Sequence, residues 1–187
     1  ENKWISHIPN LEVIENEGWK PNLWYDETDL PWVKPSPNIP DLQTAIIYSG
    51  MCLIEGTNIS EGRGTHKPFK QIGAPWIDGK NLSRKLNYYK LPGVVFQPVT
   101  FVPESIPEIS KNPKFENQKC FGVKVVIIDR NIFNSVSTGV ITLFTINQMY
   151  PDKVTYKEKH LNRLWGSDKL HKALLNKSSP FEFLDSF

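Results

Sequence analysis

The residues best suited to chemistry lie in one glycine-rich stretch, Glu55–Phe69. Two acids, Glu55 and Glu61, occur in it, and Arg63 stands between two glycines. Glycine lets a backbone approach a ligand closely, and a guanidinium can bind a carboxylate through two parallel hydrogen bonds. The stretch therefore suggests a loop that binds hydroxyl, acetamido or carboxylate groups.

Neutral polar side chains in the same stretch, Asn58, Ser60 and Thr65, add hydrogen-bond donors and acceptors. On composition alone, the alternative is an ordinary surface turn with a Glu–Arg pair, which contributes under about 1 kcal/mol. A nucleotide-binding loop is excluded, because neither GxxxxGK[ST] nor GxGxxG occurs.

Helices and strands must position this loop. Apolar spacing and capping residues predict helices over 41–50, 78–90, 138–150, 157–165 and 167–177, another starting near 180, and strands over 11–14, 93–102 and 120–129. Asp41 and Ser167 are the expected N-caps. Met51–Ile54 is either a buried strand or a last helical turn, and Pro103–Asn117 is a polar excursion. Helices and a few strands outside a strict βαβ order indicate an α+β fold.

The composition bounds the function. The net charge is +2, from 22 basic and 20 acidic residues, which is too balanced for a nucleic-acid surface. No apolar run approaches the roughly 20 residues that span a bilayer, so we expect no membrane span. The four histidines and two cysteines lack ligand spacing, so no metal and no cofactor is indicated. Cys52 and Cys120 are either two buried thiols, which we favour, or one disulfide.

A set of short motifs occurs in order along nearly the whole chain. They are Leu30–Val33, Pro35–Asn38, Glu55–Thr65, Pro68–Phe69, Ile72–Asp78, Leu91–Val94, Cys120–Val123, Asp129–Arg130, Thr138–Gly139, Tyr150–Pro151 and Leu164–Asp168. In this order they resemble the exo-β-N-acetylmuramidase (NamZ) family. The resemblance covers roughly residues 18–177. It implies release of terminal, non-reducing N-acetylmuramic acid from peptidoglycan fragments.

The resemblance also implies a two-domain enzyme with its active site in the cleft between an N-terminal Rossmann-like domain and a C-terminal α+β domain. This sequence resembles the C-terminal domain, so residues 18–187 should form that domain. Residues 1–17 should be the end of the N-terminal domain or a linker, and the Rossmann-like domain is expected to be absent. We expect a single mixed domain with a small, barrel-like sheet flanked by helices.

Glycosidases usually need two carboxyl groups, about 5–5.5 Å apart for retention and about 6.5–9.5 Å apart for inversion. The resemblance implies that the key glutamate lies in the N-terminal domain, so this chain supplies at most one partner. Glu61 is the candidate catalytic residue and Glu55 is the second choice. Either could instead bind hydroxyls or hold Arg63 in place.

The candidate substrate-binding residues are Asn38, Glu55, Asn58, Ser60, Arg63 and Thr65. Muramic acid carries a lactyl carboxylate that glucosamine lacks, and Arg63 either binds this group or only braces Glu61. Asn38 belongs to a proline-rich strap that could lie beside the loop.

Three functions remain open at this stage. The first is the substrate-binding half of a muramidase, whose partners are a muramyl saccharide and the N-terminal domain, and which is inactive alone. The second is a cell-wall glycan-binding module without catalysis, and the third is a protein-interaction domain with no sugar ligand. A peptidoglycan substrate implies an extracytoplasmic location, periplasmic or secreted.

Overall fold

The computed structural model describes residues 10–186, and the chain divides into two units, Glu1–Pro31 and Trp32–Phe187. The described part of the first unit is irregular apart from the short 3-10 helix η1, Tyr25–Glu27. The strand expected at Leu11–Ile14 is wrong. These residues pair with no strand in the described part of the chain, and an isolated strand leaves its backbone groups without ladder hydrogen bonds.

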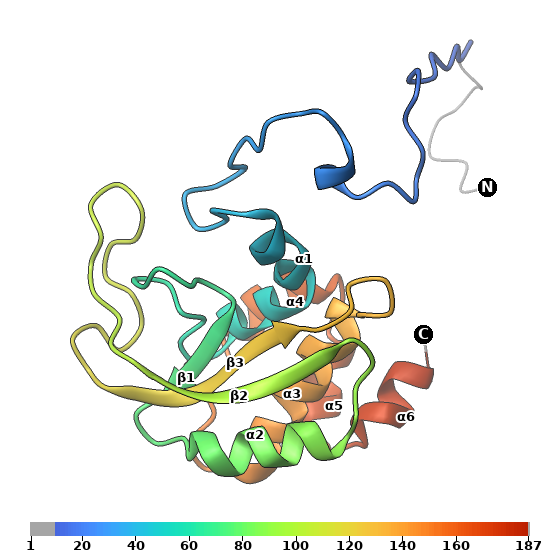
Figure 1. The fold of residues 1–187 in the computed structure, drawn as a ribbon. Helices are drawn as coiled ribbons and strands as arrows, with labels where there is room; N and C mark the ends of the chain where they lie inside the picture. Colours follow the sequence, from blue (N-terminus) through green and yellow to red (C-terminus); the bar gives the residue numbers. More distant parts are fainter. Residues whose placement is uncertain (1–9, 187) are drawn as a thin grey trace. The chain divides into compact units, whose positions relative to one another are not determined.

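The second unit contains one antiparallel sheet of three strands (Figure 1). The strands are β1 (Gln71–Ala74), β2 (Val94–Phe101) and β3 (Cys120–Ile127), in the order β1-β3-β2. Both β1 and β2 pair with β3 and not with each other, so the sheet is open. The α+β expectation is confirmed, whereas the barrel-like sheet is wrong because the two edge strands never meet.

Within residues 10–186, six α-helices accompany this sheet and extend the core. They are α1 (Leu42–Met51), α2 (Gly79–Tyr88), α3 (Ser135–Met149), α4 (Glu158–Trp165), α5 (Lys169–Leu175) and α6 (Pro180–Asp185). A 3-10 helix, η2 (Cys52–Gly56), continues α1, which agrees with the helical alternative for that stretch.

Local capping explains where several helices begin. Asp41 accepts a hydrogen bond from the amide of Thr44, as expected from the sequence. Asn134 caps α3, so this helix begins three residues earlier than its apolar stripe suggested. The cap expected at Ser167 is wrong, because Asp168 occupies the N-cap position of α5 and makes no side-chain capping bond.

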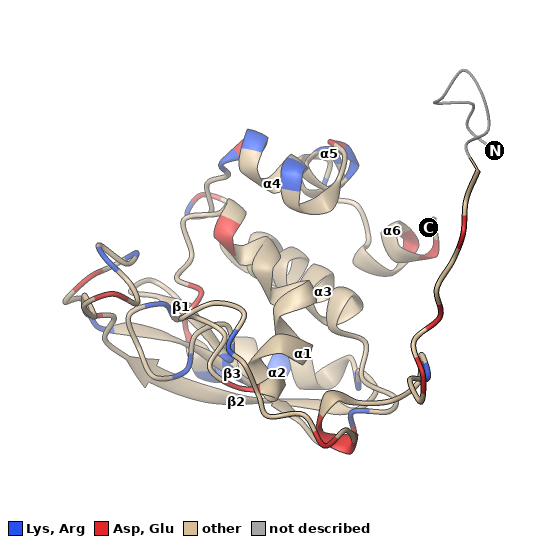
Figure 2. Cartoon of the chain, turned by 90° about the horizontal axis from the view of Figure 1, so that it is seen from above, with Lys and Arg blue, Asp and Glu red and all other residues tan. Residues whose placement is uncertain are grey.

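The interior helices α1 and α3 carry no Lys, Arg, Asp or Glu, whereas α4 and α5 carry several (Figure 2). The helices α1 and α3 cross at Gly50 and Gly139, where a Cβ on Gly139 would lie 2.3 Å from the carbonyl oxygen of Gly50. Ser135 joins the same helices by accepting from the Gly50 amide at 2.9 Å and donating to the Ile47 carbonyl at 2.7 Å. Cys52 and Cys120 are both buried and free.

Two loops meet beside the sheet, and the backbone ties them together. The loop between η2 and β1 is fastened to β1 by a bridge between Ser60 and Gly73. It is fastened to the β2–β3 loop by the amide of Glu104, which donates to the carbonyl of Gly64 at 2.8 Å. The amide of Lys157, just before α4, donates to the carbonyl of Gly56 at 2.8 Å. These contacts hold three segments that are distant in the sequence close together in space.

Candidate functional site

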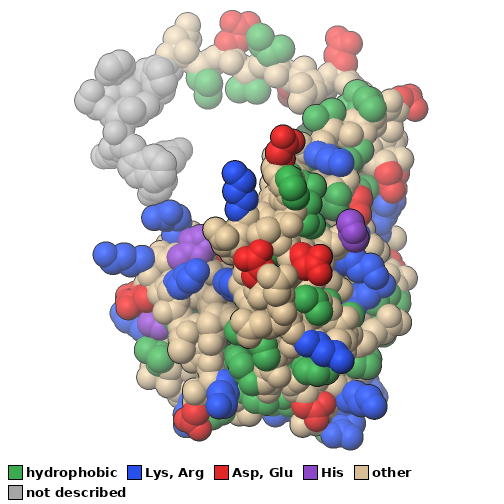
Figure 3. All heavy atoms as spheres, turned by 90° about the vertical axis from the view of Figure 1, so that its left-hand side faces the viewer, with side chains coloured by type: hydrophobic (Ala, Val, Ile, Leu, Met, Phe, Trp, Pro, Cys, Tyr) green, Lys and Arg blue, Asp and Glu red, His purple; other side chains and the backbone are tan. Residues whose placement is uncertain are grey.

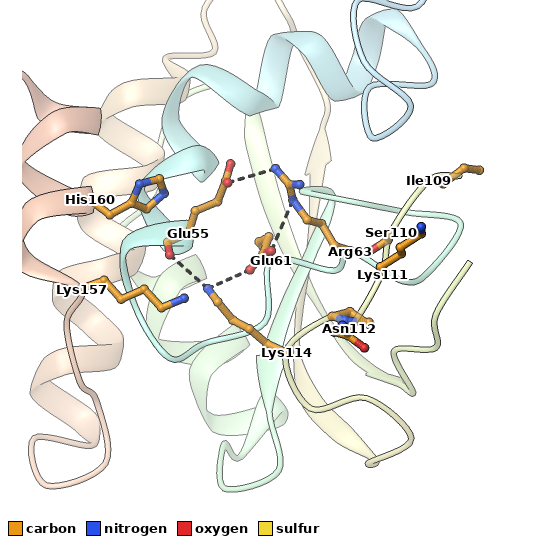
Figure 4. Close-up of a pocket in the computed structure, with 11 residues that line it drawn as sticks. Glu55, Glu61, Arg63, Ile109, Ser110, Lys111, Asn112, Lys114, Lys157 and His160 are labelled. Atoms are coloured by element: carbon orange, nitrogen blue, oxygen red, sulfur yellow. Dashed lines mark hydrogen bonds and ion pairs between the residues drawn. The ribbon is translucent and has the colours of Figure 1, made fainter. Parts of the chain in front are cut away.

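The glycine-rich loop is shaped by two glycines in the left-handed backbone region. Gly62 has a φ of 78° and Gly64 a φ of 76°, which side chains rarely tolerate. A Cβ on Gly62 would also lie 2.5 Å from the carbonyl oxygen of Gln71. This tight backbone turns the side chains of Glu61 and Arg63 toward each other (Figure 4).

Arg63 contacts two glutamates. Its Nη2 donates to Oε2 of Glu55 at 3.0 Å, and its Nε lies 3.4 Å from Oε1 of Glu61. Its guanidinium also lies over the ring of Phe69, 5.3 Å from the ring centroid. The structure therefore brings together the three charged residues that the sequence singled out.

Lys114, from the β2–β3 loop, completes the charge cluster. Its ammonium lies 2.9 Å from Oε2 of Glu61. The same ammonium donates to the backbone carbonyls of Ile54 at 3.1 Å, Glu55 at 3.3 Å and Ile59 at 3.0 Å. One lysine thus pairs with Glu61 and holds the backbone of residues 54–59 in place.

The cluster is only partly accessible to solvent. The side chain of Glu61 is 7% exposed and that of Lys114 is 19% exposed, against 35% for Arg63. Burial lowers the pKa of Lys114 from its ordinary value, and the negative charge of Glu61 opposes this shift. Charges held in such surroundings are screened less by solvent than surface pairs.

A cavity of about 520 Å³ opens beside this cluster, which is within the size range of small-molecule sites. Its lining residues come from the glycine-rich loop, the β2–β3 loop and the start of α4 (Figure 4). They are Glu55, Glu61, Arg63, Ile109, Ser110, Lys111, Asn112, Pro113, Lys114, Lys157 and His160.

One carboxylate oxygen in the cavity lining is available to accept a hydrogen bond from a ligand. Oε1 of Glu55 is buried and has no hydrogen-bond partner in the described chain, while Oε2 of Glu55 is bound to Arg63. Both oxygens of Glu61, in contrast, face cations of the chain. Because a buried acceptor without a partner costs free energy, Glu55 is well placed to accept from a ligand hydroxyl or amide.

The other sequence-derived candidates lie outside the cavity lining. Asn58 bonds the backbone of Lys153 and Thr155, and the hydroxyl of Ser60 accepts from the amide of Gly62. The hydroxyl of Thr65 donates to the Gly62 carbonyl at 2.7 Å and accepts from Gln71 at 3.0 Å. In this structure these three side chains shape the loop, and their predicted role in binding substrate stays a prediction.

Asn38 reaches the cavity only indirectly. Its amide donates to the carbonyl of Ile109 at 2.9 Å, and Ile109 lines the cavity. The proline-rich strap therefore contacts the β2–β3 loop at a wall of the cavity, and the expected position of Asn38 beside the glycine-rich loop stays a prediction.

Sequence reasoning missed the cationic part of the lining. Lys111 and Lys114 belong to the polar excursion between two strands, and Lys157 and His160 to the start of a helix. Nothing near these residues in the sequence marks them. The one available signal was that two acids in a tight loop need more than one cation to balance them.

Other kinds of site find little support. No group of three His, Cys, Asp or Glu residues that could hold a metal occurs within residues 10–186. No described helix is long and apolar enough to cross a bilayer. The face in Figure 3 mixes basic, acidic and apolar side chains, so it presents no continuous basic surface.

Comparison with known proteins gives a consistent set of relatives. The sequence profile described as exo-beta-N-acetylmuramidase NamZ, C-terminal, matches residues 46–187, and the corresponding N-terminal profile matches residues 1–43. The peptidoglycan beta-N-acetylmuramidase NamZ of Bacillus subtilis (strain 168) is 36% identical over 187 residues, which are all of this chain and 44% of that protein.

Two crystal structures of DUF1343 family proteins from Bacteroides fragilis share the fold. The first has a TM-score of 0.78 at 24% identity and covers 90% of this chain and 44% of its own. The second has a TM-score of 0.54 at 26% identity and covers 80% of this chain and 37% of its own. The chain thus spans less than half the length of these relatives. The expected domain boundary between residues 17 and 18 stays a prediction.

Proposed function

Because this chain belongs to the exo-β-N-acetylmuramidase NamZ family, we propose that it is the C-terminal, substrate-binding half of a glycoside hydrolase acting on peptidoglycan fragments. The proposed substrate carries a terminal, non-reducing N-acetylmuramic acid. The observation that carries the proposal is the cavity beside Arg63, which combines an open acceptor on Glu55 with buried, paired charges. A sugar site needs such fixed polar groups to orient hydroxyl and acetamido groups.

Each charged residue has a separate role in this proposal. Glu55 accepts a hydrogen bond from the sugar through its open oxygen. Arg63 is held in position by Glu55 and Glu61, and Lys114 fixes Glu61 from the other side. Glu61 is the proposed catalytic carboxylate of this chain, with a second carboxyl supplied by the preceding half of the enzyme.

A partner surface for that preceding half is available in the first unit. The side chains of Leu11 and Ile14 are 79% and 88% exposed, and Trp19 and Leu30 are 58% and 63% exposed. Large apolar side chains in an irregular segment favour burial against another surface. Because the N-terminal profile matches residues 1–43, we propose that these side chains pack against the rest of the N-terminal domain of the same enzyme. We also propose that the enzyme acts outside the cytoplasm, where peptidoglycan lies.

Hydrolysis of p-nitrophenyl β-N-acetylmuramide tests the proposal. The assay compares this chain, the polypeptide extended to the length of its relatives, and the extended polypeptide with Glu61→Gln. A matched control is Glu104→Gln, an exposed glutamate in the neighbouring loop. We expect turnover only from the extended form, its loss in Glu61→Gln, and no change in Glu104→Gln.

Full activity of the extended Glu61→Gln variant would remove Glu61 from catalysis and leave the family role intact. An extended polypeptide that binds muramides without cleaving them would instead support a glycan-binding module.

A further inference from the structure

The cavity lining holds more positive than negative charge. Its two glutamates, Glu55 and Glu61, already face Arg63 and Lys114. The remaining cationic and titratable side chains of the lining are Lys111, Lys157 and His160. None of these three has a carboxylate within ion-pair distance in the part of the chain that the structure describes.

Lys157 is directed at the charge cluster. In Figure 4 its ammonium approaches that of Lys114 from the opposite wall of the cavity. The positive charge of Lys157 adds to burial in lowering the pKa of Lys114. The two ammonium groups repel each other across the cavity, and within residues 10–186 only that of Lys114 has a carboxylate partner. An anion bound between them would therefore be stabilised.

His160 adds a second titratable side chain to this part of the cavity, at the same end of α4. Lys157 is the N-cap residue of α4, and His160 is three positions further, on the same side of the helix. Both side chains line the cavity, and no side chain caps the N-terminus of α4. The backbone of Lys157 is fixed by its amide bond to Gly56, which joins α4 to the glycine-rich loop.

Arg63 is less suited to a ligand carboxylate than the sequence suggested. Its Nη2 and Nε are directed at Glu55 and Glu61, so its charge is compensated twice. A ligand carboxylate there would approach two carboxylates of the chain, which like-charge repulsion disfavours.

We propose that Lys157 and His160 form an anion subsite that binds the carboxylate of an acidic amino sugar. The ammonium of Lys114 is already bonded within the chain, so it adds only its positive charge nearby. The assignment rests on the proposed function, because it names the part of that cavity that recognises the charged substituent of the substrate. Arg63 then acts as a positioning residue for Glu55 and Glu61. The subsite makes the cavity selective for acidic over neutral amino sugars.

Calorimetric titration of the 187-residue chain tests the subsite with three ligands: methyl β-N-acetylmuramide, its lactyl amide, and methyl β-N-acetylglucosaminide. The amide keeps the size of the lactyl group and removes its charge. We expect the acid to bind about tenfold more tightly than either uncharged ligand, as one charge-assisted contact provides. Added NaCl should reduce this advantage.

Single substitutions test which residues cause the preference for the acidic ligand. Lys157→Gln, and separately His160→Asn, should remove most of the tenfold preference while leaving the affinity for the glucosaminide unchanged. Lys159→Gln is the matched control, because Lys159 is exposed on the same helix and does not line the cavity. Thermal unfolding of each variant verifies that the fold is intact.

Three results would overturn the subsite. Equal affinity for all three ligands would reject it and leave the sugar site standing. Loss of the preference in Lys159→Gln as well would assign the effect to general surface charge. If none of the ligands binds, both the subsite and the sugar-binding role of this chain fail, whereas hydrolysis by the extended polypeptide tests the enzyme separately.

Discussion

The ammonium of Lys114 lies 2.9 Å from Oε2 of Glu61, so a residue of the β2–β3 loop neutralises the most buried acid of the glycine-rich loop. The same ammonium donates to the backbone carbonyls of Ile54, in η2, and of Glu55 and Ile59, in that loop. One side chain therefore links the stability of the loop to the electrostatics of the cavity.

The first prediction concerns Lys114→Met, which keeps the length of the side chain and removes its charge. Glu61 would keep only Arg63 as a cation, and three carbonyls would lose a donor. Because breaking a largely buried pair leaves an uncompensated charge, we expect the free energy of unfolding to fall by about 2–4 kcal/mol. Urea denaturation followed by circular dichroism measures the change.

The control is Lys111→Met, in the same loop and at the same cavity. Lys111 is exposed and has no carboxylate partner within the described chain, so its replacement should change stability by less than about 0.5 kcal/mol. Equal stability of the two variants would contradict the structural role of Lys114.

The second prediction concerns Arg63→Lys in the polypeptide extended to family length. Arginine reaches Glu55 and Glu61 through two different nitrogens, and a single ammonium cannot span both in that geometry. We expect kcat/KM for the muramide to fall roughly ten- to hundredfold. Arg84→Lys on the exposed side of α2 is the control, and unchanged activity of Arg63→Lys would separate this residue from the site.

The third prediction concerns the crossing of α1 and α3. In Gly139→Ala the added methyl would lie 2.3 Å from the carbonyl oxygen of Gly50, so the helices must move apart. We expect a loss of about 1–3 kcal/mol in the free energy of unfolding. Val136→Ala, on the exposed side of α3, should cost much less, and a fully stable Gly139→Ala would show that the crossing is looser than described.

The fourth prediction concerns pH. Burial raises the pKa of Cys52 and of Cys120 from 9.0 to about 11. The unfolded thiols lose their protons first, so this stability is present below about pH 9 and is lost as the pH rises through about 11. The unfolding free energy of the native chain should therefore fall more steeply over this window than that of a Cys52→Ala, Cys120→Ala double variant. If the unfolding free energies of the two proteins changed with pH in parallel, the buried thiols would not be the cause.

Local signals predicted much of the fold. The cap at Asp41 and the apolar stripes of α1 and α2 define helices by contacts a few residues apart, so a sequence pattern contains them. The strand β1 was missed because Gln71–Ala74 is short and gains its conformation from pairing with β3. The strand expected at Leu11–Ile14 was wrong for the converse reason, since an apolar run without a partner remains irregular.

The same division applies to the site. Glu55, Glu61 and Arg63 lie within nine consecutive positions, so their type and spacing already suggested a binding loop. Lys114 and Lys157 join them only because the β2–β3 loop and the start of α4 fold onto that loop, through contacts such as the Glu104–Gly64 hydrogen bond. Long-range contacts of this kind leave no local pattern.

We propose that the saccharide binds in the cavity between the glycine-rich loop, the β2–β3 loop and α4. Amide chemical-shift mapping of the isotope-labelled chain during titration with methyl β-N-acetylmuramide tests this proposal. Binding in this cavity should produce saturable shifts in residues 55–63, 109–114 and 157–160. Shifts confined to a separate cavity, which is lined by residues 77–80, 98–100 and 121, or no shifts at millimolar ligand, would contradict this proposal.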